Sequence, residues 1–345
     1  MSLLTSTPAD VEIANPPQDS ISSLAWSPTA DLLAVSSWSN EVRIYEVAAN
    51  GTSEGRAMYS HEAPALCVKW SKDGSKIVSG GADNAARLYD AASGQATQIG
   101  AHDAPVRCVE WIDMGGQSVV CTGSWDKTLK YWNLRQSTPI AQVQLPERCY
   151  TMDCVAPLLV VGTAEKHLLV FNLNNPTTPY KTLASPLHMQ TRSVACFPDA
   201  TGFALSSIEG RVAIQYIDDS QTSQNFSFKC HRADLKPSPG PPFKTGSQVV
   251  ASVNQICFHP AGTFATAGSD GIINMWDHYA RSRLKTLPNL GGPITAAAFS
   301  RTGHYLAYAI SYDWSQGFMG NAGISPKVKL HLCQEEEVKR RAAKK

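Results

Sequence analysis

The 345-residue sequence lacks the features that mark several protein classes. No apolar run approaches the roughly 20 residues of a membrane-spanning helix, and no basic start precedes a hydrophobic stretch, so we expect neither a membrane partner nor a secretory signal. The formal net charge is only +1, which gives no reason to expect bulk attraction to nucleic acid. The catalytic patterns GxSxG and HExxH and a glycine-rich phosphate loop are absent, so we predict no catalytic residue and no enzyme.

Cysteine pairs with metal-ligand spacing are also absent. The nine cysteines are odd in number and include no CxxC pair. Cys67, Cys108, Cys196 and Cys257 lie inside apolar segments, where a thiol behaves as a small buried hydrophobic group. We therefore expect free thiols in a reducing compartment, no metal site and no cofactor.

What the sequence does contain is a long repeat. Seven times, a short apolar segment ends in a large aromatic residue or its replacement, followed by a polar turn. These segments end at or near Trp26, Trp70, Trp111, Cys154, Phe197, Phe258 and Phe299. The spacings are 41 to 44 residues, apart from one of 61. Units of this length with several short strands are typical of β-propeller blades, so we predict an all-β, seven-bladed propeller.

The repeat also predicts the boundaries of the domain. One propeller would occupy residues 1–334, with residues 1–10 flexible and residues 335–345 forming a charged tail. The strand-like segment 11–15 is left over, and it can close the ring as the outer strand of the last blade, beside residues 328–332. Two insertions, at 233–248 and 311–327, are long enough to be functional or disordered loops.

Polar residues recur at fixed places in the blades. Three blades carry related sets, which are His102, Thr122, Asp126 and Trp132; His231, Thr266, Asp270 and Trp276; and His61, Ser79 and Asp83 with Tyr89 in the tryptophan position. This pattern resembles the WD-repeat family, in which the four side chains hydrogen-bond in series. An acid–base role is the alternative, but a catalytic group would normally occur once rather than in successive blades.

Unusual residues fall on one face of the predicted ring. The loop before the first strand and the turn between the second and third strands of each blade emerge together, and we call this the top face. Trp38 and Trp125 occupy such turns, where each ring either anchors a partner or packs over a neighbouring loop. Three cations, Arg211, Lys229 and Arg232, fall on the same side. A peptide with apolar anchors and acidic groups would suit this surface.

The motifs SSWSNEVRIYEV, TGSWDKTLKYWNL, SSIEGRVAIQY, FSFKCHR and GTFATAGSDGIINMWD together resemble a narrow branch of WD-repeat proteins. It contains the nuclear-pore mRNA export factors and their sister, the spindle-checkpoint propeller protein. The segment LAYAISYDWSQGF is more similar to the export factors. The resemblance implies that the top face binds the GLEBS segment of a GLFG-repeat nucleoporin, with Trp38, Trp125, Arg211 and Lys229 at positions that match the recognition surface.

Three functions follow as hypotheses. The resemblance implies a monomeric, non-enzymatic adaptor in the nucleus, at the nuclear pores of the nuclear envelope, with some protein in the cytoplasm. Direct contact with single-stranded RNA or mRNA–protein particles would be an extra property, supplied by the basic residues. A checkpoint scaffold that binds checkpoint kinases is the second hypothesis, and an enzyme with a site in the central channel is the third.

Overall fold

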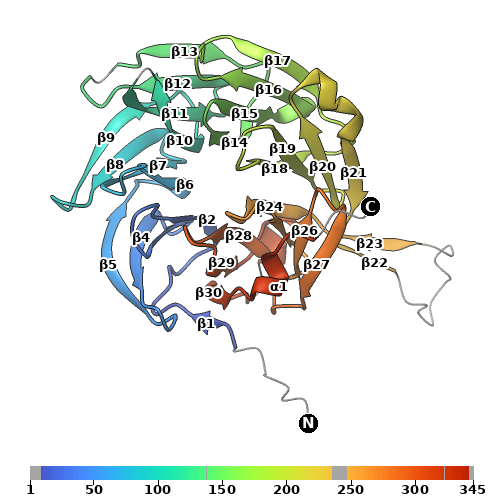
Figure 1. Ribbon diagram of the computed structural model, residues 1–345. Helices are drawn as coiled ribbons and strands as arrows, with labels where there is room; N and C mark the ends of the chain where they lie inside the picture. Colours follow the sequence, from blue (N-terminus) through green and yellow to red (C-terminus); the bar gives the residue numbers. More distant parts are fainter. Residues whose placement is uncertain (1–8, 115, 137, 235–246, 322, 342–345) are drawn as a thin grey trace.

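Each apolar segment of the repeat forms the first strand of an antiparallel sheet in the computed structural model, which describes residues 9–114, 116–136, 138–234, 247–321 and 323–341. These first strands surround the centre of a ring (Figure 1). In chain order they are β2 Ile21–Trp26, β6 Ala65–Trp70, β10 Val106–Met114, β14 Cys149–Val155, β18 Thr191–Cys196, β24 Val253–Phe258 and β28 Ile294–Phe299. The predicted seven-bladed propeller is confirmed.

Each blade has four strands that follow one another outward from the centre of the ring. The remaining strands of blades one to three are β3 Leu32–Ser37, β4 Glu41–Val47, β5 Ser53–Ser60, β7 Lys76–Gly81, β8 Ala85–Asp90, β9 Gln95–Ala101, β11 Gln117–Ser124, β12 Thr128–Trp132 and β13 Ala141–Gln144. Those of blades four to six are β15 Leu158–Thr163, β16 His167–Asn172, β17 Pro179–Ala184, β19 Gly202–Ser207, β20 Arg211–Tyr216, β21 Phe226–Lys229, β25 Phe264–Gly268, β26 Ile273–Asp277 and β27 Ser282–Leu287.

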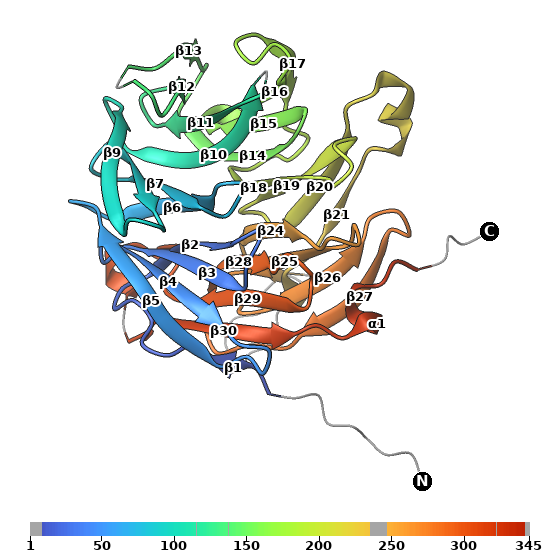
Figure 2. The same ribbon diagram turned by 60° about the vertical axis from the view of Figure 1, so that its left-hand side comes forward.

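The last blade is completed by the start of the chain. It contains β28, β29 Tyr305–Ile310, β30 Lys327–Leu332 and, as its outer strand, β1 Val11–Glu12. Val11 pairs with Leu330, and the N–H of Ile13 continues the ladder to the carbonyl of Val328 at 2.9 Å. Both views place β1 beside β30 (Figures 1 and 2). The predicted closure by the N-terminal segment is therefore confirmed.

Apolar side chains fill each interface between neighbouring blades. The tryptophans of the repeat add polar contacts between blades. The indole N–H of Trp26 donates to the carbonyl of Ala298, that of Trp70 to Ala25, both at 3.1 Å, and that of Trp111 to Lys69 at 3.4 Å. The nine cysteines are free thiols, and six of them are buried.

Both ends of the described chain are held more firmly than the sequence indicates. His331 lies between Asp10 and Glu337, with Nδ1 2.8 Å from a carboxylate oxygen of Asp10 and Nε2 2.9 Å from one of Glu337. Glu337 belongs to the short helix α1 Glu335–Val338, and its side chain is buried. Asp10 is thus bonded into the ring, and residues 335–338 of the charged C-terminal tail form a short helix whose Glu337 is bonded to His331.

The two insertions differ in what the structure describes. In the first, β22 Arg232–Asp234 and β23 Gln248–Val250 form a small hairpin, and residues 235–246 lie outside the described residues. The second includes a 3-10 turn at Phe318–Gly320, and two further 3-10 turns lie at Ala164–Lys166 and Asp219–Gln224. Among the described residues, no helix has the length and apolar character to cross a membrane.

Candidate binding face

One backbone hydrogen bond recurs in all seven blades and defines the top face. The residue that follows the second strand donates its N–H to the carbonyl of the residue before the first strand, at 2.8 to 3.1 Å. Its donors, one per blade, are Trp38, Ala82, Trp125, Ala164, Ile208, Ser269 and Ser311. These seven positions are structurally equivalent because each makes the same backbone hydrogen bond. We call this the shared backbone frame, and the side chains it carries differ from blade to blade.

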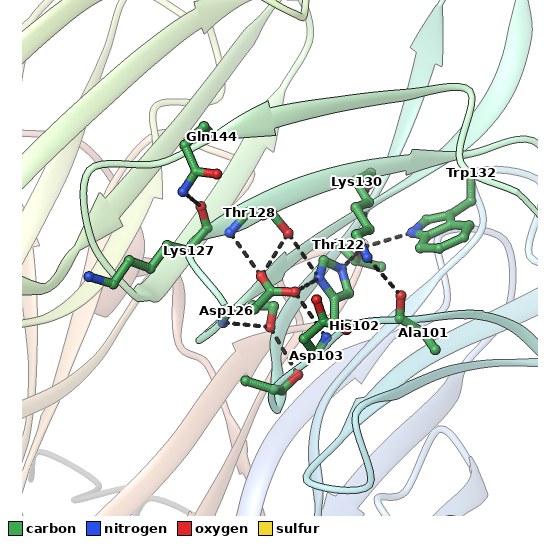
Figure 3. Close-up of polar contacts among 12 residues, drawn as sticks. Ala101, His102, Asp103, Thr122, Asp126, Lys127, Thr128, Lys130, Trp132 and Gln144 are labelled. Atoms are coloured by element: carbon green, nitrogen blue, oxygen red, sulfur yellow. Dashed lines mark hydrogen bonds and ion pairs between the residues drawn. The ribbon is translucent and has the colours of Figure 1, made fainter.

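The predicted polar set of blade three forms a continuous network near this frame (Figure 3). His102 Nδ1 lies 2.7 Å from a carboxylate oxygen of Asp126, and Nε2 lies 2.7 Å from Oγ1 of Thr122. The indole N–H of Trp132 donates to the same hydroxyl at 2.8 Å. Thr128 also donates its hydroxyl to Asp126. The network ties the loop before β10 to the turn after β11.

Blade six repeats the network. His231 Nδ1 is 2.8 Å from Asp270, and Nε2 is 2.9 Å from Oγ1 of Thr266, which also accepts the indole N–H of Trp276 at 2.9 Å. The His–Asp, His–Thr and Trp–Thr contacts are therefore the same in the two blades.

Blade two differs from the sequence-based interpretation at one residue. His61 still bridges Asp83 at 3.0 Å and Ser79 at 2.7 Å. However, the hydroxyl that donates to Ser79, at 2.9 Å, belongs to Tyr59 of the neighbouring blade, not to Tyr89. Tyr89 instead stacks on Tyr59, with ring centroids 5.2 Å apart. The repeat pattern does not indicate Tyr59, because this residue lies in the outer strand of blade one, 20 residues before Ser79.

The environment of these histidines suits a structural role. Burial lowers the pKa of His102 and of His61, although Asp126 and Asp83 oppose the shift. Burial alone would raise the pKa of Asp126, but hydrogen bonds from Thr128 and the interaction with His102 lower it on balance. A neutral imidazole that bridges a carboxylate and a hydroxyl uses both ring nitrogens in the fold.

Three of the seven equivalent top-face positions hold large apolar side chains. Trp38, Trp125 and Ile208 are 37%, 38% and 36% exposed, in blades one, three and five. The intervening blades two and four carry Ala82 and Ala164 at this position. The sequence indicates the two tryptophans but not Ile208. An isoleucine in a turn is unremarkable until the backbone hydrogen bond shows that it is equivalent to both indoles.

Trp38 has a partner that the sequence did not indicate. Its ring stacks on Trp314, from the blade-seven insertion, with centroids 5.2 Å apart and planes 26° apart. Tyr312 lies on another side of Trp314, at 5.4 Å between centroids. Trp38 therefore packs against a neighbouring blade's loop and still keeps more than a third of its surface exposed.

The three predicted cations gather around the second-to-third strand turn of blade five. Arg211 and Lys229 are partners in the β20–β21 ladder, and Arg211 Nε lies 3.8 Å from a carboxylate oxygen of Glu209. Arg232 donates to the carbonyls of Glu209 at 2.6 Å and Gly210 at 3.3 Å. Arg232 thus holds the turn in place, whereas the Lys229 side chain is exposed. All three lie in the same blade region as Ile208.

The described part of the chain contains no group of three or more His, Cys, Asp or Glu residues that could hold a metal ion. The histidine–carboxylate contacts of the top face belong to the polar networks described above. The top face presents exposed apolar side chains and cationic side chains.

Comparisons with known proteins agree with this architecture. Residues 24–114 match the family model of the anaphase-promoting complex subunit 4 WD40 domain, and residues 244–277 match the WD domain, G-beta repeat. The chain is 54% identical to a poly(A)+ RNA export protein of Schizosaccharomyces pombe, over 97% of this chain and 94% of the relative. It is 51% identical to mRNA export factor GLE2 of Chaetomium thermophilum, with the same coverage.

A more distant relative shows the same full-length similarity. Protein Rae1 of Drosophila melanogaster is 41% identical over 95% of both chains. These similarities extend over nearly the whole chain. The chain belongs to the WD-repeat family of these mRNA export factors.

Proposed function

We propose that this protein is a non-enzymatic adaptor in mRNA export that works at the nuclear pore. In this role, its top face binds the GLEBS segment of a GLFG-repeat nucleoporin. The names of its relatives support the export role. The observation that carries the proposal is the alternation on one face of three exposed apolar side chains, Trp38, Trp125 and Ile208, on a shared backbone frame.

The apolar positions suit a peptide that crosses the ring. They occupy blades one, three and five, so an extended segment could contact them in turn across the top face. Large side chains that are half-exposed before binding and desolvated after it supply most of the affinity of protein interfaces. Because their backbone is already held by the shared hydrogen bond, less conformational entropy is lost when a peptide binds.

The cations suit acidic groups in the same peptide. Lys229 is exposed and Arg211 is held beside it by strand pairing, so both can approach a carboxylate. Arg232 contributes positive charge while it holds the Glu209–Gly210 turn. The proposal therefore assigns apolar recognition to blades one to five and charge recognition to blade five.

Direct binding of single-stranded RNA is a further part of the proposal. The same cations would contact phosphates, so binding would tolerate sequence changes and weaken steeply with salt. It would share Arg211 and Lys229 with the peptide and would not need Trp125. Competition between RNA and the peptide therefore distinguishes shared from separate sites.

Charge reversal tests the adaptor role in cells. Arg211→Glu with Lys229→Glu should abolish capture of the nucleoporin and remove the tagged protein from the nuclear rim. The matched control is Lys72→Glu with Arg135→Glu, two exposed cations in turns that connect other strand ends. Unchanged rim localisation of the Arg211/Lys229 variant would contradict the assignment, and localisation of the wild type at kinetochores alone would favour the checkpoint scaffold.

A further inference from the structure

The second residue of every first strand forms a ring around the upper end of the central channel. In each blade, a register shift at this residue takes it out of regular pairing. The ring contains, in blade order, Ser22, Leu66, Arg107, Tyr150, Arg192, Asn254 and Thr295. Two arginines therefore flank one tyrosine, on blades three to five. Neither composition nor the repeat alone predicts this arrangement, because the three residues lie in separate blades.

A second ring of charged residues lies deeper in the channel. Lys69, Glu110 and Asp153 are each the fifth residue of their first strand, on blades two to four. These residues are three positions further along each strand than the upper ring, which corresponds to about 10 Å between the two levels. Lys69 Nζ contacts Glu110 at 2.6 Å and Asp153 at 3.4 Å. The cation of the lower ring is thus paired within the fold.

The upper arginines are not paired in this way. Among the described residues, neither Arg107 nor Arg192 forms an ion pair with a carboxylate. Arg107 donates to the carbonyl of Leu66 at 3.3 Å, and Arg192 donates to Oδ1 of Asn254 at 3.0 Å. Each guanidinium has five N–H donors, so most of their donors have no protein acceptor. Nε of Arg192 is buried without a hydrogen-bond partner.

Asp313, the carboxylate that interacts electrostatically with Arg192, is already bonded to other groups. Asp313 accepts from Oγ of Ser269 at 2.5 Å and from Nδ2 of Asn254 at 3.1 Å. Burial lowers the pKa of Arg192 and the positive charge of Arg107 lowers it further, whereas the negative charge of Asp313 opposes the shift without cancelling it. Two like charges that line one cavity and leave hydrogen-bond donors unsatisfied destabilise a protein unless an anion compensates them.

Space for an anion is present at the same place. Arg107, Tyr150 and Arg192 line a cavity of about 370 Å³ in the channel, which the paired set Lys69, Glu110 and Asp153 also lines. No described residue forms a hydrogen bond with the Tyr150 hydroxyl, which sits between the two guanidinium groups in the ring order. A carboxylate or phosphate group in this cavity would accept charge-assisted hydrogen bonds from both arginines.

We propose that Arg107 and Arg192, with Tyr150 between them, form an oxyanion-binding site at the upper end of the central channel. The site takes one phosphate or carboxylate group. The group comes either from a free anion or from an acidic side chain that enters the channel from the top face. The site does not depend on the nucleoporin assignment, because the top-face residues Trp38, Trp125 and Lys229 are not part of it.

Calorimetric titration of the full chain tests the site, with inorganic phosphate as one probe and glutarate as the other. One saturable site is expected, and Arg107→Gln or Arg192→Gln should each weaken binding by about tenfold or more. Arg135→Gln, at an exposed arginine outside the channel, should bind as the wild type does. Preference for phosphate would favour a free anion, and preference for glutarate would favour an acidic side chain.

Two results would overturn the site. One is the absence of saturable binding of either probe to the wild type. The other is equal affinity in the wild type and both glutamine variants. NMR of the arginine Nε–Hε groups in the wild type gives an answer even if the variants fail to fold. The signals of Arg107 and Arg192 should shift on titration with phosphate, and shifts confined to other arginines would contradict the site.

Discussion

The indole of Trp38 stacks on that of Trp314, a residue 276 positions away in the chain that lies in the neighbouring blade. Trp314 adopts a left-handed backbone conformation, with φ of +60°. This conformation costs a non-glycine residue about 1–2 kcal/mol. The strained backbone therefore occurs at a residue whose side chain supports an exposed ring of the top face.

Two substitutions at this position separate strain from contact. Trp314→Ala removes the stacked ring and keeps the strained backbone, whereas Trp314→Gly removes both. We expect Trp314→Gly to be the more stable variant by about 1 kcal/mol, and both variants to bind the nucleoporin peptide more weakly than the wild type. Urea unfolding and peptide titration measure the two effects, and an alanine variant more stable than the glycine variant would argue against the backbone strain.

Much of the fold could be predicted from the sequence, because a repeat of about 43 residues is a local pattern that recurs seven times. Trp26 and Trp70 mark the ends of first strands, and Trp111 lies three residues before the end of another, without any knowledge of contacts. The places of Trp314 and Ile208 on the top face were not predictable in the same way. Each depends on which loops meet across blades, and this information is absent from the local sequence.

The polar network of blade three gives a stability prediction. Thr122→Val keeps the side-chain shape but leaves the indole N–H of Trp132 and Nε2 of His102 without their shared partner. We expect a loss of about 1–3 kcal/mol in the free energy of unfolding. The control is Thr178→Val, at an exposed threonine, which should change stability by less than about 0.5 kcal/mol. Equal stability of the two variants would contradict the role of the network.

The contact of His331 with both chain ends predicts a dependence of stability on pH. Burial alone would lower the pKa of His331, but hydrogen bonds to Asp10 and Glu337 raise it to about 9. The group titrates near 6.5 when unfolded, so its stabilising contribution is complete below about pH 6.5 and is lost as the pH rises to about 9.

The partner carboxylate has the opposite dependence. Burial alone would raise the pKa of Glu337, but its hydrogen bond with His331 lowers it to about 2, so its contribution to stability is lost as the pH falls from 4.5 toward 2.

The raised pKa of His331 is tested on the alkaline side. Chemical unfolding between pH 6 and 9 should show a steeper loss of stability for the wild type than for His331→Gln. His304→Gln, at an exposed histidine, is the control, and parallel curves for wild type and His331→Gln would contradict the expectation.

The central claim is that the two top-face tryptophans anchor the nucleoporin peptide. It is tested most directly by titrating a synthetic GLEBS peptide into the wild type, Trp38→Ala with Trp125→Ala, and the control Ile140→Ala with Tyr180→Ala. The control residues are exposed apolar side chains next to turns between third and fourth strands, away from the top face. We predict a loss of affinity of about a hundredfold or more for the tryptophan pair and no change for the control. Wild-type affinity in the tryptophan variant would contradict the account.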